Sequence, residues 1–391
     1  MEFEYWWLIG FPLFFGMGWL AARIDIRHLL TESRQLPRSY FKGLNFLLNE
    51  QPDKAIEAFI EVAKVDRETL ELHFALGSLF RRRGETERAI RMHRNLLERG
   101  DLDDRQRLEA MFELGQDYLK AGLLDRAEEA FSRLRTTSYR GEALRFLLDI
   151  YQQEKDWDKS IEVARELEKD TGDSWQREIA NYYCELAVHE ANHSRLEDAK
   201  QHLADALAAN RKSVRANLVL GDMHAAAGEH ELAVETWKHI EHQQPVYLAL
   251  CGQRMLDSFK LLGRATEGLT LLRGYLASYP SLDLLDVASQ SALEAQGPEA
   301  AYKLVKEELR RNPSLLGLDK LLEVQIIVAP AERRADLELI RNLVHTHTHR
   351  LARYRCEKCG FKARQFYWHC PACGGWETYP PRRSEEFDLA P

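Results

Sequence analysis

The sequence lacks the excess of positive charge that proteins binding the phosphates of nucleic acids usually carry. Its 391 residues include 54 Lys and Arg against 62 Asp and Glu, which gives a net charge of −8. This balance argues against a generic nucleic-acid-binding function. Only the end of the chain is locally basic, with nine Lys and Arg against five Asp and Glu from Arg341 onward.

Cysteine is scarce over most of the chain. Six are present, and four of them fall within the last 36 residues. The other two, Cys184 and Cys251, stand alone in helical patterns, where a single free cysteine behaves as a small apolar residue. We predict that both are buried.

Long stretches without charge are also lacking, apart from residues 5–22. Eighteen helical residues span about 27 Å, close to the ~30 Å hydrocarbon core of a bilayer. Tyr5, Trp6 and Trp7 lie at one end and Trp19 near the other, as expected for side chains at the two membrane interfaces. We therefore predict one transmembrane helix at the N-terminus.

The residues that flank this segment predict its orientation. Two acidic residues precede it, Glu2 and Glu4, whereas several arginines follow it, among them Arg23 and Arg27. The positive-inside rule then places the N-terminus in the periplasm and the remaining chain in the cytoplasm. A cleaved signal peptide is the rival interpretation, but it requires a basic first region, and this one is acidic.

Similar segments recur along the middle of the chain at a spacing near 34 residues. The units carry a glycine and an aromatic residue on a first helix, a turn, and a small residue followed by an aromatic residue on a second helix, or equivalents of these residues. The recurring positions are Gly43, Phe46, Ala55 and Phe59; Gly77, Phe80, Gly84 and Ala89; Gly115, Tyr118, Gly122, Ala127 and Phe131; Leu147, Tyr151, Ser160 and Ala164; Ala187, Ala199 and Leu203; Gly221, Gly228, Ala233, Trp237 and Pro245; Phe259, Gly263, Leu272 and Pro280; and Ala301 in an eighth unit that ends at Pro313.

This pattern resembles tetratricopeptide repeats over roughly residues 37–313. Small residues let two helices approach closely, glycine with positive φ closes the turn, and proline ends the second helix. The resemblance implies a right-handed superhelix whose concave groove binds peptides or protein segments. A further helix pair is expected over residues 315–350. An unrelated helical bundle is the alternative. The fourth and fifth units depart most from the pattern, and we expect the groove to be interrupted or bent there.

Two histidine motifs invite a catalytic or metal-binding interpretation. The segment His189-Glu190-Ala191-Asn192-His193 matches the zinc-protease pattern H-E-x-x-H. It lies at the end of a repeat helix and has no third ligand in a matching frame, so we interpret its residues as solvated. His345, His347 and His349 form a second cluster, which we place at the end of the last helix.

The C-terminal cysteines carry the most specific chemical signal. Cys356 and Cys359 form one CxxC turn and Cys370 and Cys373 a second, each followed by glycine, with a spacer of ten residues. Four thiolates at this spacing predict one metal ion, iron or zinc, in a four-cysteine site. Disulfides are the alternative, which a reducing cytoplasm disfavours. Four protein ligands leave no open catalytic position on zinc, whereas iron would permit electron transfer.

This segment resembles a shortened rubredoxin-type metal site, and we call it the C-terminal knuckle (residues 351–381). Fewer than 40 residues cannot bury a sufficient core, so the metal must supply the folding energy. Aromatic residues are expected to cover the site and pack it on the last helices, and His369 is expected at the surface or behind a ligand. The aromatic residues are Phe361, Phe366, Tyr367, Trp368 and Trp376.

The order of anchor, repeats and knuckle resembles the lipopolysaccharide assembly protein B family of Gram-negative bacteria over nearly the full length. The stretches that carry the resemblance are residues 43–48, 83–91, 121–128 and 367–371. The expected division is 1–22 anchor, 23–36 linker, 37–313 repeats, 314–350 C-terminal helices, 351–381 knuckle and 382–391 tail. Of the family's functional residues, only the four cysteine ligands transfer by position.

The resemblance implies a non-enzymatic adaptor of the inner membrane that restrains lipopolysaccharide synthesis. Its implied partners are the deacetylase that commits precursor to lipid A, a membrane-bound AAA+ protease and other envelope-assembly membrane proteins. No nucleic-acid partner is expected, and whether the chain forms a homodimer is left open. The main alternative is a membrane-tethered redox protein with a rubredoxin-like iron centre. A metalloprotease that uses His189 and His193 is a third, weaker hypothesis.

Overall fold

The computed structural model describes residues 70–348 and 354–383, together with part of the preceding chain. The described positions before residue 70 are Phe15, Met17, Lys42, Asn45, Phe46, Gln51 and residues 54–58. The predicted membrane segment, residues 5–22, therefore lies outside the described residues except for Phe15 and Met17. Within the described part, no helix is both long enough and apolar enough to cross a membrane.

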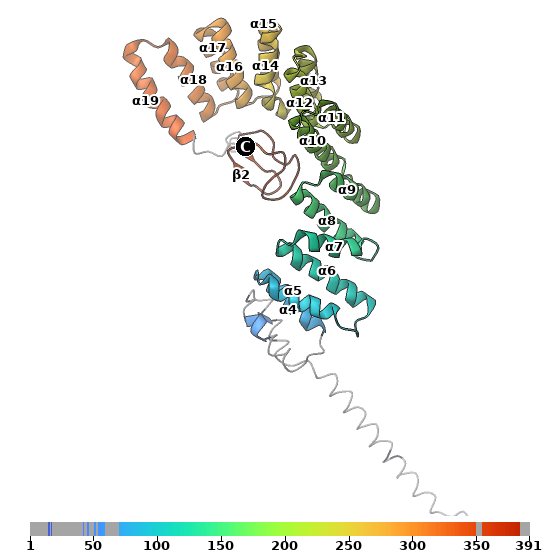
Figure 1. Cartoon of the computed structure of the whole chain (residues 1–391). Helices are drawn as coiled ribbons and strands as arrows, with labels where there is room; N and C mark the ends of the chain where they lie inside the picture. Colours follow the sequence, from blue (N-terminus) through green and yellow to red (C-terminus); the bar gives the residue numbers. More distant parts are fainter. Residues whose placement is uncertain are drawn as a thin grey trace, which may run out of the picture. The chain divides into compact units, whose positions relative to one another are not determined.

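The chain divides into two compact units, Met1–Glu154 and Lys155–Pro391. Both are helical, and helices that follow one another in the sequence pack side by side within each unit (Figure 1). The first unit contains α4 (Leu70–Arg82), α5 (Thr86–Leu97), α6 (Asp104–Lys120), α7 (Leu124–Leu134) and α8 (Arg140–Glu154).

The second unit contains the remaining helices and the knuckle. Its elements are α9 (Trp157–Thr171), α10 (Gln176–Asn192), α11 (Leu196–Ala209), α12 (Val214–Ala226), α13 (His230–Gln243), the 3-10 helix η1 (Pro245–Leu250), α14 (Gly252–Leu261), α15 (Ala265–Ser278), α16 (Leu282–Gln296), α17 (Pro298–Arg311), α18 (Leu315–Val328), α19 (Ala331–Thr348), β1 (Tyr354–Arg355) and β2 (Lys362–Ala363). This is a mainly helical superhelix of the tetratricopeptide type with a C-terminal metal-ribbon module, as the sequence predicts.

Glycine on the first helix of a repeat lets an aromatic side chain of the second helix pack against the backbone. A Cβ atom at Gly115 would lie 2.8 Å from the Phe131 ring, and one at Gly221 would lie 2.3 Å from Nε1 of Trp237. Phe131 and Trp237 are fully buried. Steric exclusion at these glycines therefore sets how closely the paired helices approach.

Turns between paired helices use residues with positive φ. The predicted turn glycines Gly84, Gly122, Gly228 and Gly263 all have φ between 71° and 80°, so this prediction is confirmed. In the degenerate fourth and fifth units, Lys155 (φ 59°) and Ser194 (φ 62°) occupy the equivalent position. The turn geometry is thus retained there without glycine, at some conformational cost.

Proline and serine separate successive repeats in the C-terminal part of the second unit. Pro280 and Pro313 follow the ends of α15 and α17. The next residue in each case caps the following helix: Ser281 Oγ accepts from Leu284 N at 3.5 Å, and Ser314 Oγ accepts from Gly317 N at 3.0 Å. A sequence of proline followed by serine therefore stops one helix and starts the next.

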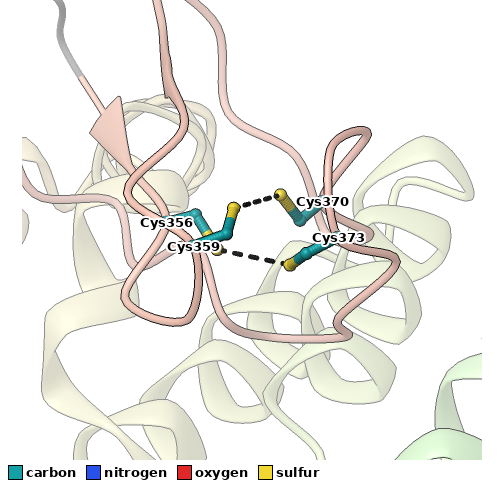
Figure 2. A group of neighbouring side chains, drawn as sticks. All are labelled: Cys356, Cys359, Cys370 and Cys373. Atoms are coloured by element: carbon teal, nitrogen blue, oxygen red, sulfur yellow. Dashed lines mark hydrogen bonds between the residues drawn. The ribbon is translucent and has the colours of Figure 1, made fainter. Parts of the chain in front are cut away.

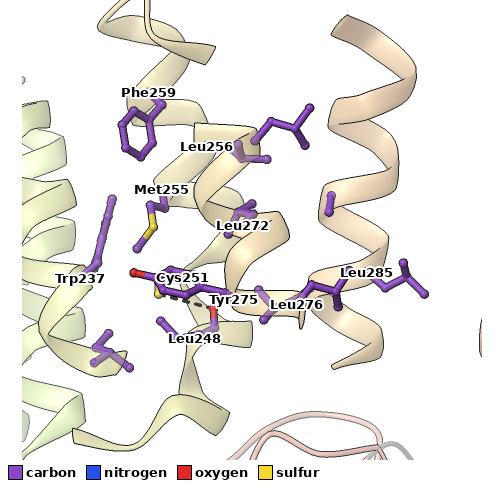
Figure 3. Close-up of a cluster of buried hydrophobic side chains, with 14 of the residues drawn as sticks. Trp237, Leu248, Cys251, Met255, Leu256, Phe259, Leu272, Tyr275, Leu276 and Leu285 are labelled. Carbon is purple, nitrogen blue, oxygen red and sulfur yellow. Dashed lines mark hydrogen bonds between the residues drawn. The ribbon is translucent and has the colours of Figure 1, made fainter. Parts of the chain in front are cut away.

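One buried cluster of the second unit extends from α12 to α18. Trp237, Met255, Leu272 and Leu285 come from α13, α14, α15 and α16 and lie in one buried cluster (Figure 3). Cys251 lies within this cluster and is fully buried, and burial raises the pKa of its thiol to about 12. Cys184 is equally buried, so the prediction for both lone cysteines is confirmed.

Candidate metal centre

Two short antiparallel pairings frame the two CxxC turns. Tyr354 of β1 pairs with Ala363 of β2 on either side of the first turn, and His369 pairs with Trp376 on either side of the second. Each pairing brings the chain back on itself, so each pair of cysteines sits at the tip of a narrow hairpin.

The two turns repeat one backbone geometry. The amide of Gly360 donates to the carbonyl of Cys356 at 2.9 Å, and the amide of Gly374 donates to the carbonyl of Cys370 at 2.9 Å. Both glycines have positive φ, 76° and 65°, which a residue with a Cβ rarely adopts. Glycine after each CxxC therefore closes the turn that carries the sulfurs.

The four sulfur atoms converge on one point between the turns (Figure 2). All four lie within 4.8 Å of one another. Cys356 Sγ is 3.8 Å from Cys373 Sγ, and Cys359 Sγ is 3.8 Å from Cys370 Sγ. A tetrahedral site with Zn–S bonds of about 2.3 Å has S–S edges of roughly 3.8 Å, whereas a disulfide bond is about 2.05 Å. The donor set fits one tetrahedral metal ion.

The surroundings of the sulfurs favour thiolate at Cys356. Burial of this residue raises its pKa, but the Thr378 hydroxyl, 3.3 Å from Sγ, and nearby backbone amides outweigh burial and lower the pKa of Cys356 to about 6. Cys356 and Cys370 are buried, while Cys359 is exposed. Four cysteines complete a tetrahedral shell, so such a site has no open position for substrate.

Trp376 anchors the knuckle to the first helices of the second unit. Its side chain is 3% exposed. The ring packs edge-on against Trp157 of α9 (centroids 6.1 Å apart) and Tyr182 of α10 (5.8 Å), and it stacks on His369 of the knuckle at 4.5 Å. A tryptophan buried among aromatic rings is typical of a stable packing interface.

Trp368 provides a second anchor on the following repeats. It stacks on Tyr247 of η1 with centroids 5.3 Å apart and an interplanar angle of 3°. The Arg215 guanidinium of α12 lies 5.6 Å from the centroids of both Trp368 and Trp376 and donates to Glu185 at 2.8 Å. Arg215 therefore bridges the two anchors through cation–π contacts.

Polar contacts supplement the aromatic ones. Asn181 Nδ2 donates to Glu377 Oε1 at 2.9 Å, and Arg177 Nε lies 3.9 Å from the same carboxylate. Arg383, just beyond the knuckle, donates through Nε to Asp283 of α16 at 2.9 Å. Burial raises the pKa of Glu377, which the Asn181 hydrogen bond only partly offsets.

Comparison with known proteins agrees with both parts of the fold. The rubredoxin metal binding domain matches residues 354–381, and tetratricopeptide repeats match residues 72–108, 112–174 and 184–237. Lipopolysaccharide assembly protein B of Escherichia coli K12 is 36% identical over 376 residues, which covers 95% of this chain and 96% of that protein. The same protein of Haemophilus influenzae is 29% identical over 396 residues, covering 96% and 97%.

This chain belongs to the lipopolysaccharide assembly protein B family. The similarity extends over nearly the whole length of both relatives, so the resemblance found in the sequence is confirmed.

One expectation about this family member is wrong. The aromatic residues of the knuckle do not pack it on the last helices: Trp376 contacts α9 and α10, and Trp368 contacts η1. Phe361 remains 37% exposed. The reason is that a stack of repeats brings helices remote in sequence next to the chain end, which local patterns cannot reveal.

His369 supports the second turn of the knuckle. Its Nε2 donates to the carbonyl of Gly374 at 3.0 Å, and its ring stacks on Trp376. Burial lowers the pKa of His369, so the neutral ring is favoured at neutral pH. Its place behind a cysteine turn agrees with the expectation from the sequence.

The zinc-protease motif has no site around it. His189 and His193 lie at the end of α10 with ring centroids 4.3 Å apart, and Glu190 pairs with Arg195 at 2.9 Å. In the described part of the chain, no third metal-binding residue joins them. In the other histidine cluster, His345 Nδ1 lies 3.0 Å from Asp319, while the His347 side chain and His349 lie outside the described residues.

Sequence reasoning missed the residues that hold the knuckle from the repeat side. Trp157, Asn181 and Arg215 lie in separate repeats and belong to no metal motif. One signal was available in the sequence: Arg215 stands six residues before Gly221, where three earlier repeats carry glutamate. Those glutamates are Glu71, Glu109 and Glu142, six residues before Gly77, Gly115 and Leu148.

Proposed function

We propose that this chain is a non-enzymatic adaptor of the inner membrane that regulates lipopolysaccharide synthesis. Membership of the lipopolysaccharide assembly protein B family supports this role, because this chain is similar to its relatives over nearly their full length. Tetratricopeptide repeats are stacked scaffolds whose extended surfaces bind other proteins. The proposal therefore assigns the chain a binding function with no bond chemistry of its own.

In this proposal the chain presents the deacetylase that commits precursor to lipid A to a membrane-bound AAA+ protease. The segment of residues 5–22 anchors the chain with its N-terminus in the periplasm and its repeats in the cytoplasm. Anchoring confines the bound client to the membrane surface where the protease resides. The resulting effective concentration accelerates degradation without a new contact between client and protease.

We also propose that Cys356, Cys359, Cys370 and Cys373 hold one structural metal ion. The ion supplies the folding free energy of a module too small to bury its own core, ~10–16 kcal/mol in comparable zinc peptides. The chain's own residues then position that module: the cysteine turns fold around the site, and the two tryptophans dock it.

The observation that carries the proposal is the packing of the buried Trp376 and the half-buried Trp368 against the repeats. A mobile electron carrier binds its partners transiently, whereas this knuckle is fixed by aromatic, cation–π and hydrogen-bond contacts to α9, α10, α12 and η1. The knuckle acts as a brace of the scaffold. The knuckle also covers part of the repeat surface, so partners bind to the part of that surface that the knuckle does not cover.

The test is the lifetime of the deacetylase in cells. Deleting the gene for this chain should lengthen the half-life of the deacetylase, and the full-length chain should restore rapid turnover. A version that lacks residues 1–22 should fold but fail to restore it. Full restoration by the untethered version would contradict the proximity mechanism.

A redox function is the second candidate, because Cys359 is exposed and could bring an iron centre close to a partner. Purified protein with visible charge-transfer bands and a reversible potential would favour it. A colourless protein with one zinc ion per chain would exclude it.

A further inference from the structure

The last described helix, α19, leaves a stripe of large apolar side chains uncovered. Leu339 is 62% exposed, Ile340 47% and Leu343 66%. Terminal repeats of a helical stack normally present a polar outer face, because no further repeat covers them. The apolar end of this stack therefore needs an explanation.

One side of α19 is already used. Arg341 pairs with Asp319 and Glu323 of α18, and His345 pairs with Asp319. The later residue of α19, His345, contacts the earlier residue of α18, Asp319, whereas the earlier Arg341 also reaches the later Glu323, so the two helices run antiparallel. Positions 337, 341, 344 and 348 form this covered side at spacings of three and four residues.

The opposite side carries a second stripe with the same spacing. It begins with Glu332 and Asp336 and continues with Leu339 and Leu343, with Ile340 alongside. Among the described residues, neither Glu332 nor Asp336 takes part in an ion pair. Two arginines, Arg333 and Arg334, lie between these carboxylates in the sequence, and Nε of Arg334 donates to the carbonyl of Ala329 at 3.2 Å.

Ion pairs inside the second unit join neighbouring repeats, mostly a helix and the second helix before it, whereas α18 and α19 are consecutive. In most such junctions the later helix contributes the cation and the earlier helix the carboxylate. The pairs with this polarity are Arg215–Glu185, Arg254–Asp222, Arg264–Glu231, Lys320–Asp286 and Arg341–Asp319. Lys260–Glu294 has the reverse polarity. By this polarity, we expect the carboxylates of α19 to pair with cations of a segment that continues the stack.

We propose that α19 is a docking surface for an amphipathic helix of a partner protein, which adds to the stack as its next helix. The partner helix runs antiparallel to α19, as α18 does. Its apolar residues, spaced three and four apart, cover Leu339, Ile340 and Leu343. Lys or Arg in its last turns pairs with Glu332 and Asp336, where cations also complement the helix dipole.

Two other occupants fit less well. In an antiparallel arrangement, a second copy of α19 would place its own Glu332 and Asp336 against the leucines, and in a parallel arrangement acid would face acid. An anionic bilayer would be repelled by the same carboxylates. Charge complementarity therefore favours a partner helix with a basic end.

The experiment uses the full-length chain in lipid nanodiscs with p-benzoylphenylalanine in place of Leu343. The probe is a designed helical peptide of about 18 residues with an apolar stripe and two arginines near its C-terminus. Light should cross-link this peptide to the chain, and a matched peptide with glutamates in place of the arginines should react at least tenfold less. Leu339→Arg should abolish the reaction, whereas Leu261→Arg, at a leucine 70% exposed on α14, should leave it unchanged.

A charge exchange separates docking from misfolding. Glu332→Lys together with Asp336→Lys should shift the preference about tenfold toward the glutamate peptide, a gain that an unfolded protein cannot show. Cross-links to a second copy of the chain would replace the proposal with a dimer, and adducts with lipid would replace it with a membrane contact. Equal cross-linking of the arginine peptide and the glutamate peptide would also overturn the proposal.

Discussion

At the scale of single residues, close packing between glycine and an aromatic ring determines the stability of a repeat. Gly221→Ala places a Cβ 2.3 Å from the buried Trp237 ring, and overpacking of this kind costs ~1–3 kcal/mol. We expect the free energy of unfolding, measured by urea denaturation, to fall by that amount. The matched control is Gly274→Ala in α15, where a Cβ meets nothing within 4 Å; it should stabilise by ~0.5–1 kcal/mol.

The buried carboxyl of Glu377 makes stability depend on pH. Burial raises its pKa above the ordinary value of 4.5. The stability it contributes is therefore fully present below the unfolded pKa and is lost as pH rises through the folded pKa. Glu377→Gln keeps the acceptor for Asn181 and should raise the melting temperature at pH 8. The difference in melting temperature between this variant and the unchanged protein should become smaller toward pH 5. A difference that instead widens toward pH 5 would contradict this account.

Residue-scale features differ in how far the sequence predicts them. Turn glycines, buried lone cysteines and the four converging cysteines follow from spacing and from steric rules that act within a few residues. The positive φ of Lys155 and Ser194 does not, because nothing in the side chain favours it. Tertiary packing imposes that conformation on the degenerate units.

At the scale of elements, the cysteine turns and the docking of the knuckle can be tested separately. Cys356→Ser with Cys359→Ser should abolish metal binding and unfold the knuckle, because ~10–16 kcal/mol of folding free energy is lost. Elemental analysis and hydrogen exchange over residues 354–383 measure the two effects. The control is Cys251→Ser, which should leave the metal content of the protein unchanged. An unchanged metal content in the double variant would refute the four-cysteine site.

Trp376→Ala should detach the knuckle without releasing its metal. Truncating a buried tryptophan costs ~3–5 kcal/mol, and the lost contacts are with α9, α10 and the His369 ring rather than with the cysteine sulfurs. We expect faster hydrogen exchange in α10 at an unchanged metal content. Phe361→Ala, at an exposed aromatic residue of the same module, should change neither. Loss of metal from the tryptophan variant would show that docking and metal binding are one event.

The elements also show where sequence reasoning fails. Helix pairs and their ends are encoded locally by glycine, proline and serine. The surface on which the knuckle docks is assembled from Trp157, Asn181, Arg215 and Tyr247, which come from successive repeats. Only the stacking of those repeats brings them together, so no local pattern reports them.

At the scale of the whole molecule, the central claim is that the chain couples a client to a protease by proximity at the membrane. The direct measurement is the rate of deacetylase degradation by the purified AAA+ protease in proteoliposomes, with and without this chain. We predict that the full-length chain accelerates degradation at least tenfold, that a chain lacking residues 1–22 loses most of this effect, and that raising the concentration of the truncated chain restores it. Degradation at the same rate with and without the full-length chain would contradict the account.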